Sequence, residues 1–381
     1  MSSGPFDLQP RTRVVFGAGS LARLGELAVE LGARRVLLVT DAHIVAAGHA
    51  DRAEDSLDTL GLAVARYAGA RENPTTVDAE ACRDALDEHA ADLVVAVGGG
   101  SSIDTAKGGN FLHSCGGRME DYWGVGTATS PLLPMIAVPT TAGTGSEVQS
   151  FALIAQEAGH QKMACGDPSC APRVALLDPD LTRTAPALVT AHTGLDALTH
   201  AVETAVTTKR NAASRLYARE AFRLAERALP RVLADRADDE ARGDMLLAAT
   251  WAGLAIEHSM LGAAHSLANP LTAHFDVPHG QAVGMMLPHV VRYNGALPEA
   301  RAQYAHLVHV EDARAADVLA ARVEELLDAA ALPRSIEHFG VGEDDLASLA
   351  REAAGQWTAR FNPRPVAADD LRGLYRAALA R

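Results

Sequence analysis

The order of strand and helix signals constrains the fold of this chain most. Over the first 185 residues, short runs of β-branched and aliphatic residues alternate with segments of helical spacing, and the clearest strands fall in residues 12–17, 34–41, 91–98, 134–139 and 172–178. Such alternation is typical of a parallel sheet, because a parallel pair of strands needs a crossover connection. We therefore expect an α/β domain with a parallel sheet that is covered on both faces.

The pattern changes after about Pro186. Beyond it, strand signals disappear and helical periods dominate, with helices predicted at 187–206, 212–234, 241–261 and 315–332. A chain of 381 residues also exceeds one typical core. We predict an α/β domain over residues 1–185 and an all-helical domain over residues 186–381.

The charge and hydropathy of the chain exclude several partners. A net charge of −14 disfavours nucleic acid and anionic membranes, since both require a basic face. The sequence contains no apolar run long enough to span a bilayer, and its N-terminus does not resemble a signal peptide. Its four cysteines include no C-x-x-C pair, which favours a reduced, cytoplasmic protein, although the spacing of Cys165 and Cys170 leaves open a role as metal ligands.

Two glycine-containing segments compete as a phosphate-binding loop. Residues 17–22 (GAGSLA) follow a strand and fit G-x-G-x-x-A, with Asp41 at the end of the next strand. Residues 98–107 (GGGSSIDTAK) place three glycines, Gly98, Gly99 and Gly100, after a strongly apolar strand and before a helix that Ser101, Ser102 and Asp104 open. Glycines that allow close approach and a helix N-terminus suit a pyrophosphate.

We favour the second segment because another small-residue loop follows the next strand. Residues 139–147 (PTTAGTGSE) include Thr140, Thr141 and Thr144. In a parallel sheet, loops at the carboxyl ends of neighbouring strands meet at one edge. These hydroxyls are therefore expected beside the three glycines. A plain strand-to-helix turn is the alternative for either glycine segment.

A possible metal site follows in the helical half. Asp196 and His200 stand four residues apart, so both lie on one face of a helix. One carboxylate with three imidazoles suits Fe(II), Zn(II) or Mn(II). The further histidines come from a candidate set, and spacing does not choose among them because prolines 270, 278 and 288 are expected to break the helical register: His265, His274, His279 and His289.

Together these motifs resemble the iron-containing (group III) alcohol dehydrogenase family over nearly the whole chain. They are GGGSSIDTAK, PTTAGTGSE, DALTHAVE and the histidine run that ends in LPHVVRYN, in this order. The resemblance implies an N-terminal dinucleotide-binding domain, a helical metal-binding domain and a catalytic divalent metal. It implies direct hydride transfer between a nicotinamide and a small alcohol or aldehyde, with the metal as a Lewis acid.

The resemblance also assigns residues. It implies that the metal ligands are Asp196, His200, His265 and His279. It implies that the Gly98–Ser101 loop binds the pyrophosphate and that the three threonines lie at the nicotinamide side. It also implies that Asp41 lies at the adenosine ribose, Asn73 at the adenine side and Lys162 at the ribose side. Asp104 is expected to be a further cofactor contact. Phe151, Ile256 and Asn269 are expected to line the substrate pocket. The 17–22 segment then has no role in cofactor binding.

One departure from the family concerns proton transfer. The family usually has a histidine four residues beyond the third ligand, whereas this chain has Asn269. An amide forms hydrogen bonds but does not carry a proton near pH 7. His274 is a candidate substitute, with a surface or capping role as the alternative.

Asp41 favours NAD over NADP, because a carboxylate accepts hydrogen bonds from a ribose 2′-hydroxyl and repels a 2′-phosphate. A plain turn cap is the alternative for this residue. Fe(II) and Zn(II) accept the same ligands, so the sequence leaves the ion open. The resemblance further implies a homodimer or a larger homo-oligomer.

Three other functions remain as alternatives. Maleylacetate reductases and other reductases of oxo-acids or phosphonate aldehydes share this two-domain plan. Dehydroquinate synthase shares it too, but its anionic substrate needs basic groups that the motifs here lack. A nucleotide sensor without catalysis would not need an open metal site.

Overall fold

The computed structural model of this chain describes residues 6–157 and 162–379. The described residues form two compact units. One covers Gln9–Ala185, and the other begins at Pro186 and includes the short segment before Gln9. Each unit has its own secondary structure and core.

The first unit contains a six-stranded sheet in which every neighbouring pair is parallel. Its strands, in spatial order, are β1 (Arg13–Phe16), β9 (Val174–Leu177), β6 (Met135–Pro139), β4 (Leu93–Gly98), β2 (Arg35–Val39) and β3 (Ala63–Tyr67). The predicted parallel sheet is confirmed.

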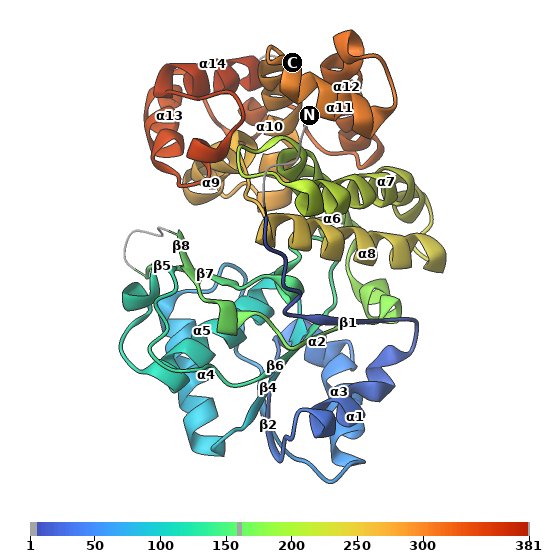
Figure 1. Cartoon of the computed structure of the whole chain (residues 1–381), viewed down its shortest axis with the longest axis vertical. Coiled ribbons are helices and arrows are strands. Elements are labelled where there is room, and N and C mark those ends of the chain that lie inside the picture. The colour runs from blue at the N-terminus through green and yellow to red at the C-terminus, as the bar shows by residue number, and fades with distance from the viewer. Residues whose placement is uncertain (1–5, 158–161, 380–381) are drawn as a thin grey trace. The chain divides into compact units, whose positions relative to one another are not determined.

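Alternate side chains of these strands pack on opposite faces of the sheet. On one face, Leu38 belongs to a core with helices α1 (Leu24–Glu30) and α3 (His49–Asp58). On the other face, Leu37 packs with α4 (Thr76–His89) and α5 (Gly100–Cys115). Figure 1 shows α4 and α5 on one side of the strands and α1 and α3 on the other. Because both faces are covered, the strands read as nearly continuous apolar runs.

A second, smaller sheet in this unit was not predicted. It contains β5 (Gly124–Val125), β8 (Lys162–Gly166) and β7 (Phe151–Ala155), with β7 antiparallel to β8. The unit also contains the short helix α2 (Ala42–Ala46). β5 has only two residues, and β7 (FALIA) and β8 (KMACG) contain a single β-branched residue between them, so the sequence carries only a weak strand signal here.

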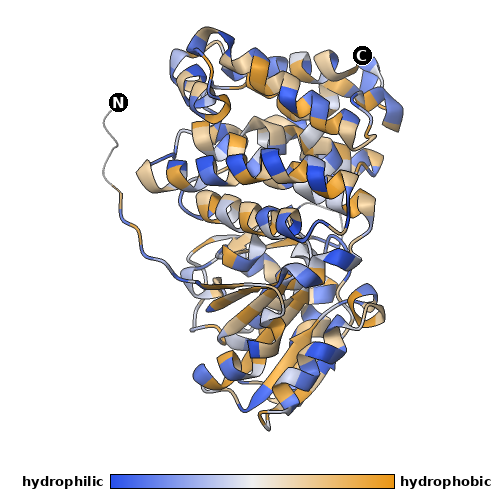
Figure 2. Cartoon of the chain, turned by 90° about the vertical axis from the view of Figure 1, so that its right-hand side faces the viewer, coloured by the Kyte–Doolittle hydropathy of each residue, from blue (hydrophilic) through white to orange (hydrophobic). Residues whose placement is uncertain are grey.

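The second unit is helical, and its described residues include no strand. Its helices are α6 (Ala187–Val206), α7 (Ala212–Ala234), α8 (Asp239–Glu257), α9 (Ala263–Phe275), α10 (His279–Asn294), α11 (Pro298–Val308), α12 (Asp312–Ala329), α13 (Leu346–Gly355) and α14 (Ala368–Leu379). Figure 2 shows hydrophilic and hydrophobic residues alternating along many of these helices, as expected when one face of a helix is buried. None of the helices in the described residues combines the length and apolar character needed to cross a bilayer.

The prediction that three prolines break the helical register was wrong for two of them. Pro270 lies inside α9 and Pro288 lies inside α10. Only Pro278 marks a boundary, because it immediately precedes α10. A proline removes a single backbone donor, and tertiary packing of the surrounding helix compensates for that loss.

Candidate functional site

Helix α6 carries three polar side chains on one buried face. Residues 194–206 of this helix are all buried. Asp196, His200 and Glu203 recur at intervals of four and three residues, so they line one side of the helix. Asp196 and His200 were predicted from the sequence and Glu203 was not, although its spacing within DALTHAVE was a signal for it.

Three histidines surround one carboxylate oxygen. Oδ1 of Asp196 lies 3.3 Å from Nε2 of His200, 3.5 Å from Nε2 of His265 and 3.7 Å from Nε2 of His279. The His200 and His265 rings are stacked with centroids 4.8 Å apart. Ligand atoms of Asp196, His265 and His279 all lie within 4.8 Å of one another. The structure thus brings together all four residues of the predicted ligand set.

These distances fit a shared cation better than direct hydrogen bonds. They exceed the usual 2.7–3.2 Å of an N–H···O bond. Ligands about 2.1 Å from one tetrahedral ion would lie about 3.4 Å apart. The buried atoms Asp196 Oδ1 and His265 Nε2 also have no hydrogen-bond partner. Buried polar atoms rarely remain unsatisfied, so the donor set fits a divalent metal.

The charges of this cluster shift two titrations. Burial alone would raise the pKa of Asp196, but the His200, His265 and His279 imidazoles hold it well below its usual range. Burial alone would lower the pKa of His265, but the Glu203 and Asp196 carboxylates outweigh it and raise that pKa while no cation shares the cluster. The cluster therefore favours an ionised carboxylate and attracts positive charge.

Two glycines allow α9 and α10 to approach α6. A Cβ atom on Gly280 would lie 2.0 Å from the backbone oxygen of His192 in α6. This close contact places His279, the first residue of α10, beside Asp196. A Cβ atom on Gly262, the residue before α9, would lie 3.0 Å from Oε1 of Glu203. Both glycines thus serve the convergence of the three helices.

Asn269 and His274 have different surroundings. Asn269 follows His265 by one turn of α9, is partly buried, and donates a hydrogen bond to Oε1 of Gln356 at 3.0 Å. The side chain of His274 is 49% exposed and pairs with Glu352 at 2.7 Å. This exposed ion pair agrees with the surface alternative for His274, and its role in proton transfer stays a prediction.

The two small-residue loops of the first unit meet as expected. Thr140 donates its backbone N–H to the carbonyl of Gly98 at 3.0 Å. A Cβ atom on Gly100 would lie 2.5 Å from Cγ2 of Thr144, and one on Gly99 would lie 3.4 Å from Oγ1 of Thr141. Helix α5 begins at Gly100 and has no side-chain cap at its N-terminus. Its first N–H groups, including that of Ser101, are therefore oriented to receive an anion.

Asp41 lies beside this loop and also caps a helix. Its Oδ1 accepts the backbone N–H groups of His43 and Ile44 at 2.9 and 3.1 Å, and its Oδ2 accepts the Ser102 hydroxyl at 3.0 Å. A carboxylate has about four acceptor positions, so these bonds leave capacity for a ribose hydroxyl. The capping alternative is observed, and the ribose contact stays a prediction.

Lys107 and Asp104 contact the segment 139–147, which carries the three threonines and is called the threonine loop below. The buried Lys107 ammonium contacts four acceptors at 2.7–3.0 Å: the carbonyl oxygens of Ser146, Gln149 and Phe151, and the Ser146 hydroxyl. Asp104 accepts the Ser146 hydroxyl at 2.7 Å. Burial raises the pKa of Asp104, opposed by the Lys107 charge. Asp104 thus faces Ser146 inside the protein, and Lys107 is a second residue that sequence analysis left without a role.

Asn73 and Lys162 are linked through the small sheet. The exposed Asn73 has a left-handed backbone with φ of 51°, a conformation that asparagine tolerates. The next residue, Pro74, accepts the N–H of Ala155, which pairs with Lys162 in β7–β8. Asn73, predicted at the adenine side of the cofactor, and Lys162, predicted at its ribose side, therefore belong to connected segments. Phe151 begins β7 and is partly buried, whereas Ile256 is buried in α8 of the other unit.

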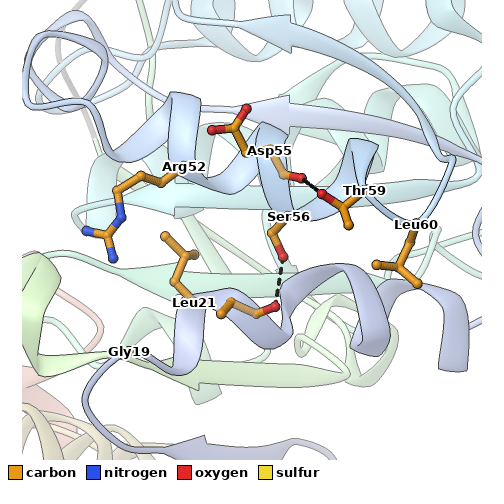
Figure 3. Close-up of a pocket in the computed structure, with 8 residues that line it drawn as sticks. Gly19, Leu21, Arg52, Asp55, Ser56, Thr59 and Leu60 are labelled. Carbon is orange, nitrogen blue, oxygen red and sulfur yellow. Dashed lines mark hydrogen bonds between the residues drawn. The ribbon is translucent and has the colours of Figure 1, made fainter.

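In the competing segment 17–22, a carboxylate of the protein accepts the backbone N–H groups that a phosphate would need. Gly19 and Leu21 donate their backbone N–H groups to the two oxygens of Asp178, both at 3.0 Å. Asp178 therefore takes the place that a phosphate would need. Figure 3 shows a hollow beside this segment, between its short helix and α3, where Ser56 donates to the carbonyl of Ala22 at 3.1 Å. The segment is a capped structural turn.

Cys165 and Cys170 are unsuited to bind a metal as thiolates. Both are buried in the first unit, and burial raises the pKa of each thiol to about 12. The ligand group found among the described residues contains no cysteine. The alternative reading of these thiols as ligands has no support in the structure.

Comparisons with known proteins cover both units. Residues 10–179 match a family described as iron-containing alcohol dehydrogenase, and residues 190–379 match the C-terminal domain of the Fe-containing alcohol dehydrogenase family. An NAD-dependent methanol dehydrogenase from Bacillus methanolicus is 32% identical, over 96% of this chain and 97% of its own length.

Solved structures agree in fold. An alcohol dehydrogenase from Oenococcus oeni superposes with a TM-score of 0.94 at 30% identity, over 98% of this chain and all of its own. A sulfoacetaldehyde reductase from Bifidobacterium kashiwanohense, solved with NAD+, gives a TM-score of 0.89 at 28% identity, over 99% of both chains. Both similarities extend across the two units.

Proposed function

Because this chain belongs to the iron-containing alcohol dehydrogenase family, we propose that it interconverts a small primary alcohol and its aldehyde with NAD and a divalent metal, Fe(II) or Zn(II). The resemblance noted in the sequence and the predicted enzyme class are confirmed by the family match. The observation that carries the metal-dependent proposal is the buried Oδ1 of Asp196, which has three imidazole nitrogens within 3.7 Å and no hydrogen bond.

Asp196, His200, His265 and His279 hold the metal in this proposal. When bound, a divalent cation would act as a Lewis acid toward a substrate oxygen. The task of the four side chains is to fix the position of the cation, which would take a substrate oxygen as a fifth ligand. A divalent cation held by three neutral imidazoles and one carboxylate would keep a net positive charge, which favours an anionic oxygen.

The cofactor belongs to the first unit. Gly98–Ser101 and the uncapped N-terminus of α5 receive the pyrophosphate, while Thr140, Thr141 and Thr144 orient the nicotinamide side. Asp41 binds the adenosine ribose and favours NAD. Asn73 contacts the adenine side and Lys162 a ribose, and the two belong to connected segments of the small sheet. These residues orient the cofactor, whose nicotinamide would supply or accept hydride directly.

The three side chains expected to contact the substrate, Phe151, Ile256 and Asn269, comprise two apolar groups and one amide. We propose a short, uncharged aldehyde or primary alcohol as substrate. The name of the sulfoacetaldehyde reductase makes an anionic aldehyde the specific alternative to test.

The experiment uses protein purified without air. Metal content is measured, the ion is removed with a chelator, and Fe(II) or Zn(II) is restored. NADH or NADPH oxidation is then followed with propanal, lactaldehyde and sulfoacetaldehyde. Metal-dependent turnover with the neutral aldehydes supports the proposal. Faster turnover with sulfoacetaldehyde would instead assign an anionic aldehyde as the substrate. NADH binding without turnover of any aldehyde would contradict the proposed dehydrogenase function.

A further inference from the structure

Glu203 is a buried carboxylate beside the ligand cluster. Its side chain is 3% exposed, and Oε2 lies 2.6 Å from Nδ1 of His265. Oε1 accepts the backbone N–H of Ala264 at 2.7 Å. Within the described residues, no lysine or arginine forms an ion pair with Glu203. A buried carboxylate is costly unless it is paired and hydrogen-bonded, so the His265 and Ala264 contacts must account for its presence.

We propose that Glu203 is a positioning residue that fixes the proton of His265 on Nδ1 and thereby leaves the Nε2 lone pair for the metal. This inference rests on the proposed function. An ionised carboxylate only accepts hydrogen bonds, so Nδ1 must be the donor across the 2.6 Å contact. The other ring nitrogen, Nε2, is the buried atom without a hydrogen bond, 3.5 Å from Asp196.

The same helix thus sets both the ligands and the orientation of the third histidine. Asp196 and Glu203 both stand on α6, while His265 stands on α9 between their two carboxylates. Carboxylates that bind the outer nitrogen of a ligating histidine fix its tautomer and raise its basicity. The contact to Ala264 holds the first turn of α9 in the position that this geometry needs.

A role limited to capping α9 is the competing explanation. Glu203→Gln separates the two roles, because an amide oxygen still accepts the Ala264 N–H while the amide NH₂ group faces Nδ1. That donor would turn Nδ1 into an acceptor and move the proton to Nε2, where it blocks the metal. Capping would survive this change, and metal binding would weaken.

The test measures metal affinity rather than turnover. The full-length chain is stripped with a chelator, Co(II) is titrated while its visible absorption is recorded, and Zn(II) is titrated by calorimetry. Asp87→Asn is the matched control, because Asp87 also contacts Nδ1 of a histidine, His113, at 2.5 Å but lies at an exposed site in the first unit. We expect Glu203→Gln to bind each ion about 10- to 100-fold more weakly and the control to match the wild type.

The outcomes are distinct. If Glu203→Gln binds Co(II) and Zn(II) as tightly as the wild type does, the inference is overturned. A lower melting temperature of the metal-free variant together with unchanged metal affinity also overturns it, because only the capping role would then be left. A wild-type protein that binds neither ion contradicts the proposed function instead. If Glu203→Gln does not fold, Glu203→Asp replaces it. This variant keeps the charge but is one methylene shorter, and unchanged metal affinity in it would equally overturn the inference.

Discussion

The ammonium group of Lys107 contacts Ser146 twice, at 2.7 Å through the carbonyl oxygen and at 3.0 Å through the hydroxyl. Lys107 lies in α5, the helix that follows the glycine loop, and Ser146 lies in the threonine loop. One buried cation therefore ties together the two segments that we assign to the dinucleotide. Its contacts extend to the carbonyls of Gln149 and Phe151.

Lys107→Met should destabilise the first unit. The change leaves several buried acceptors without a donor and Asp104 without its nearby positive charge. We expect the free energy of unfolding to fall by about 3–5 kcal/mol and NADH to bind more weakly. Urea unfolding and fluorescence titration with NADH measure the two effects. Lys209→Met is the control, and equal stability of the two variants would contradict the prediction.

Gly100→Ala should weaken NADH binding. The added Cβ atom would meet Cγ2 of Thr144 at 2.5 Å and Oγ1 at 2.7 Å, so the two loops must separate. A cost of about 1.4 kcal/mol corresponds to a tenfold higher Kd, and overpacking typically costs that much or more. Gly373→Ala in α14 is the matched control, because no atom lies within 4 Å of its added Cβ. Calorimetric titration that finds the same Kd for both variants would refute this expectation.

Asp178→Asn should lower stability without affecting the cofactor. Asp178 is fully buried and accepts the N–H groups of Gly19 and Leu21 with separate oxygens. An amide replaces one acceptor with a donor, so we expect a loss of about 1.5–3 kcal/mol in urea unfolding. The Kd for NADH should remain unchanged. A marked rise in that Kd would show that the 17–22 segment binds the cofactor after all.

His49 should make stability depend on pH. Burial and Arg52 lower the pKa of His49 from its usual 6.5. Because the folded protein binds this proton less readily than the unfolded chain, stability is complete above about pH 6.5 and declines as the pH falls toward the folded pKa. The slope in this window approaches about 1.4 kcal/mol per pH unit for one proton.

His49→Asn removes this titration. Unfolding in urea at pH 7.5, 6.5 and 5.5 should therefore show a flatter profile than the wild type, together with a lower absolute stability from the lost Thr184 hydrogen bond. His192 retains a slope of its own, since burial also lowers its pKa. The exposed His338→Asn serves as control, and parallel profiles for wild type and His49→Asn would disprove the assignment.

Asp196→Asn should abolish stabilisation by metal. In the wild type, an ion at 100 times its Kd should raise the free energy of unfolding by about 2.7 kcal/mol. The variant lacks the charge that three imidazoles face, so added Zn(II) should leave its melting temperature unchanged. Asp180→Asn, at a partly exposed position in the first unit, is the control. An equal thermal shift in both variants would exclude this ligand set.

Strong local periods could be predicted from the sequence. The predicted helix 187–206 coincides with α6 and the predicted helix 212–234 coincides with α7, because their apolar spacing runs without interruption. The small sheet was missed because β5 has only two residues and because β7 and β8 are poor in the β-branched residues that mark the strands of the main sheet. The prediction that Pro270 and Pro288 interrupt helices was wrong, because packing of the surrounding helix compensates for one missing backbone donor.

Candidate ligands were recognised by residue type, whereas supporting contacts required the fold. Glu203 meets His265 across 62 residues of sequence, and Asp178 meets Leu21 across 157. Neither contact between residues so far apart in sequence follows from a local sequence pattern. The sequence already favoured the second glycine segment, because a small-residue loop follows the next strand, whereas the Asp178 contacts that fill the first segment required the fold.

The placement of three acidic and imidazole groups along α6 also limits where this protein can change in length. One residue inserted between Asp196 and Glu203 would rotate everything beyond it by about 100° around the helix axis. The connecting segments before α9 and α10 are not helical, so an added residue there does not rotate one ligand relative to another around a helix axis. Insertions and deletions should therefore accumulate in the connections, while α6 keeps a fixed residue count.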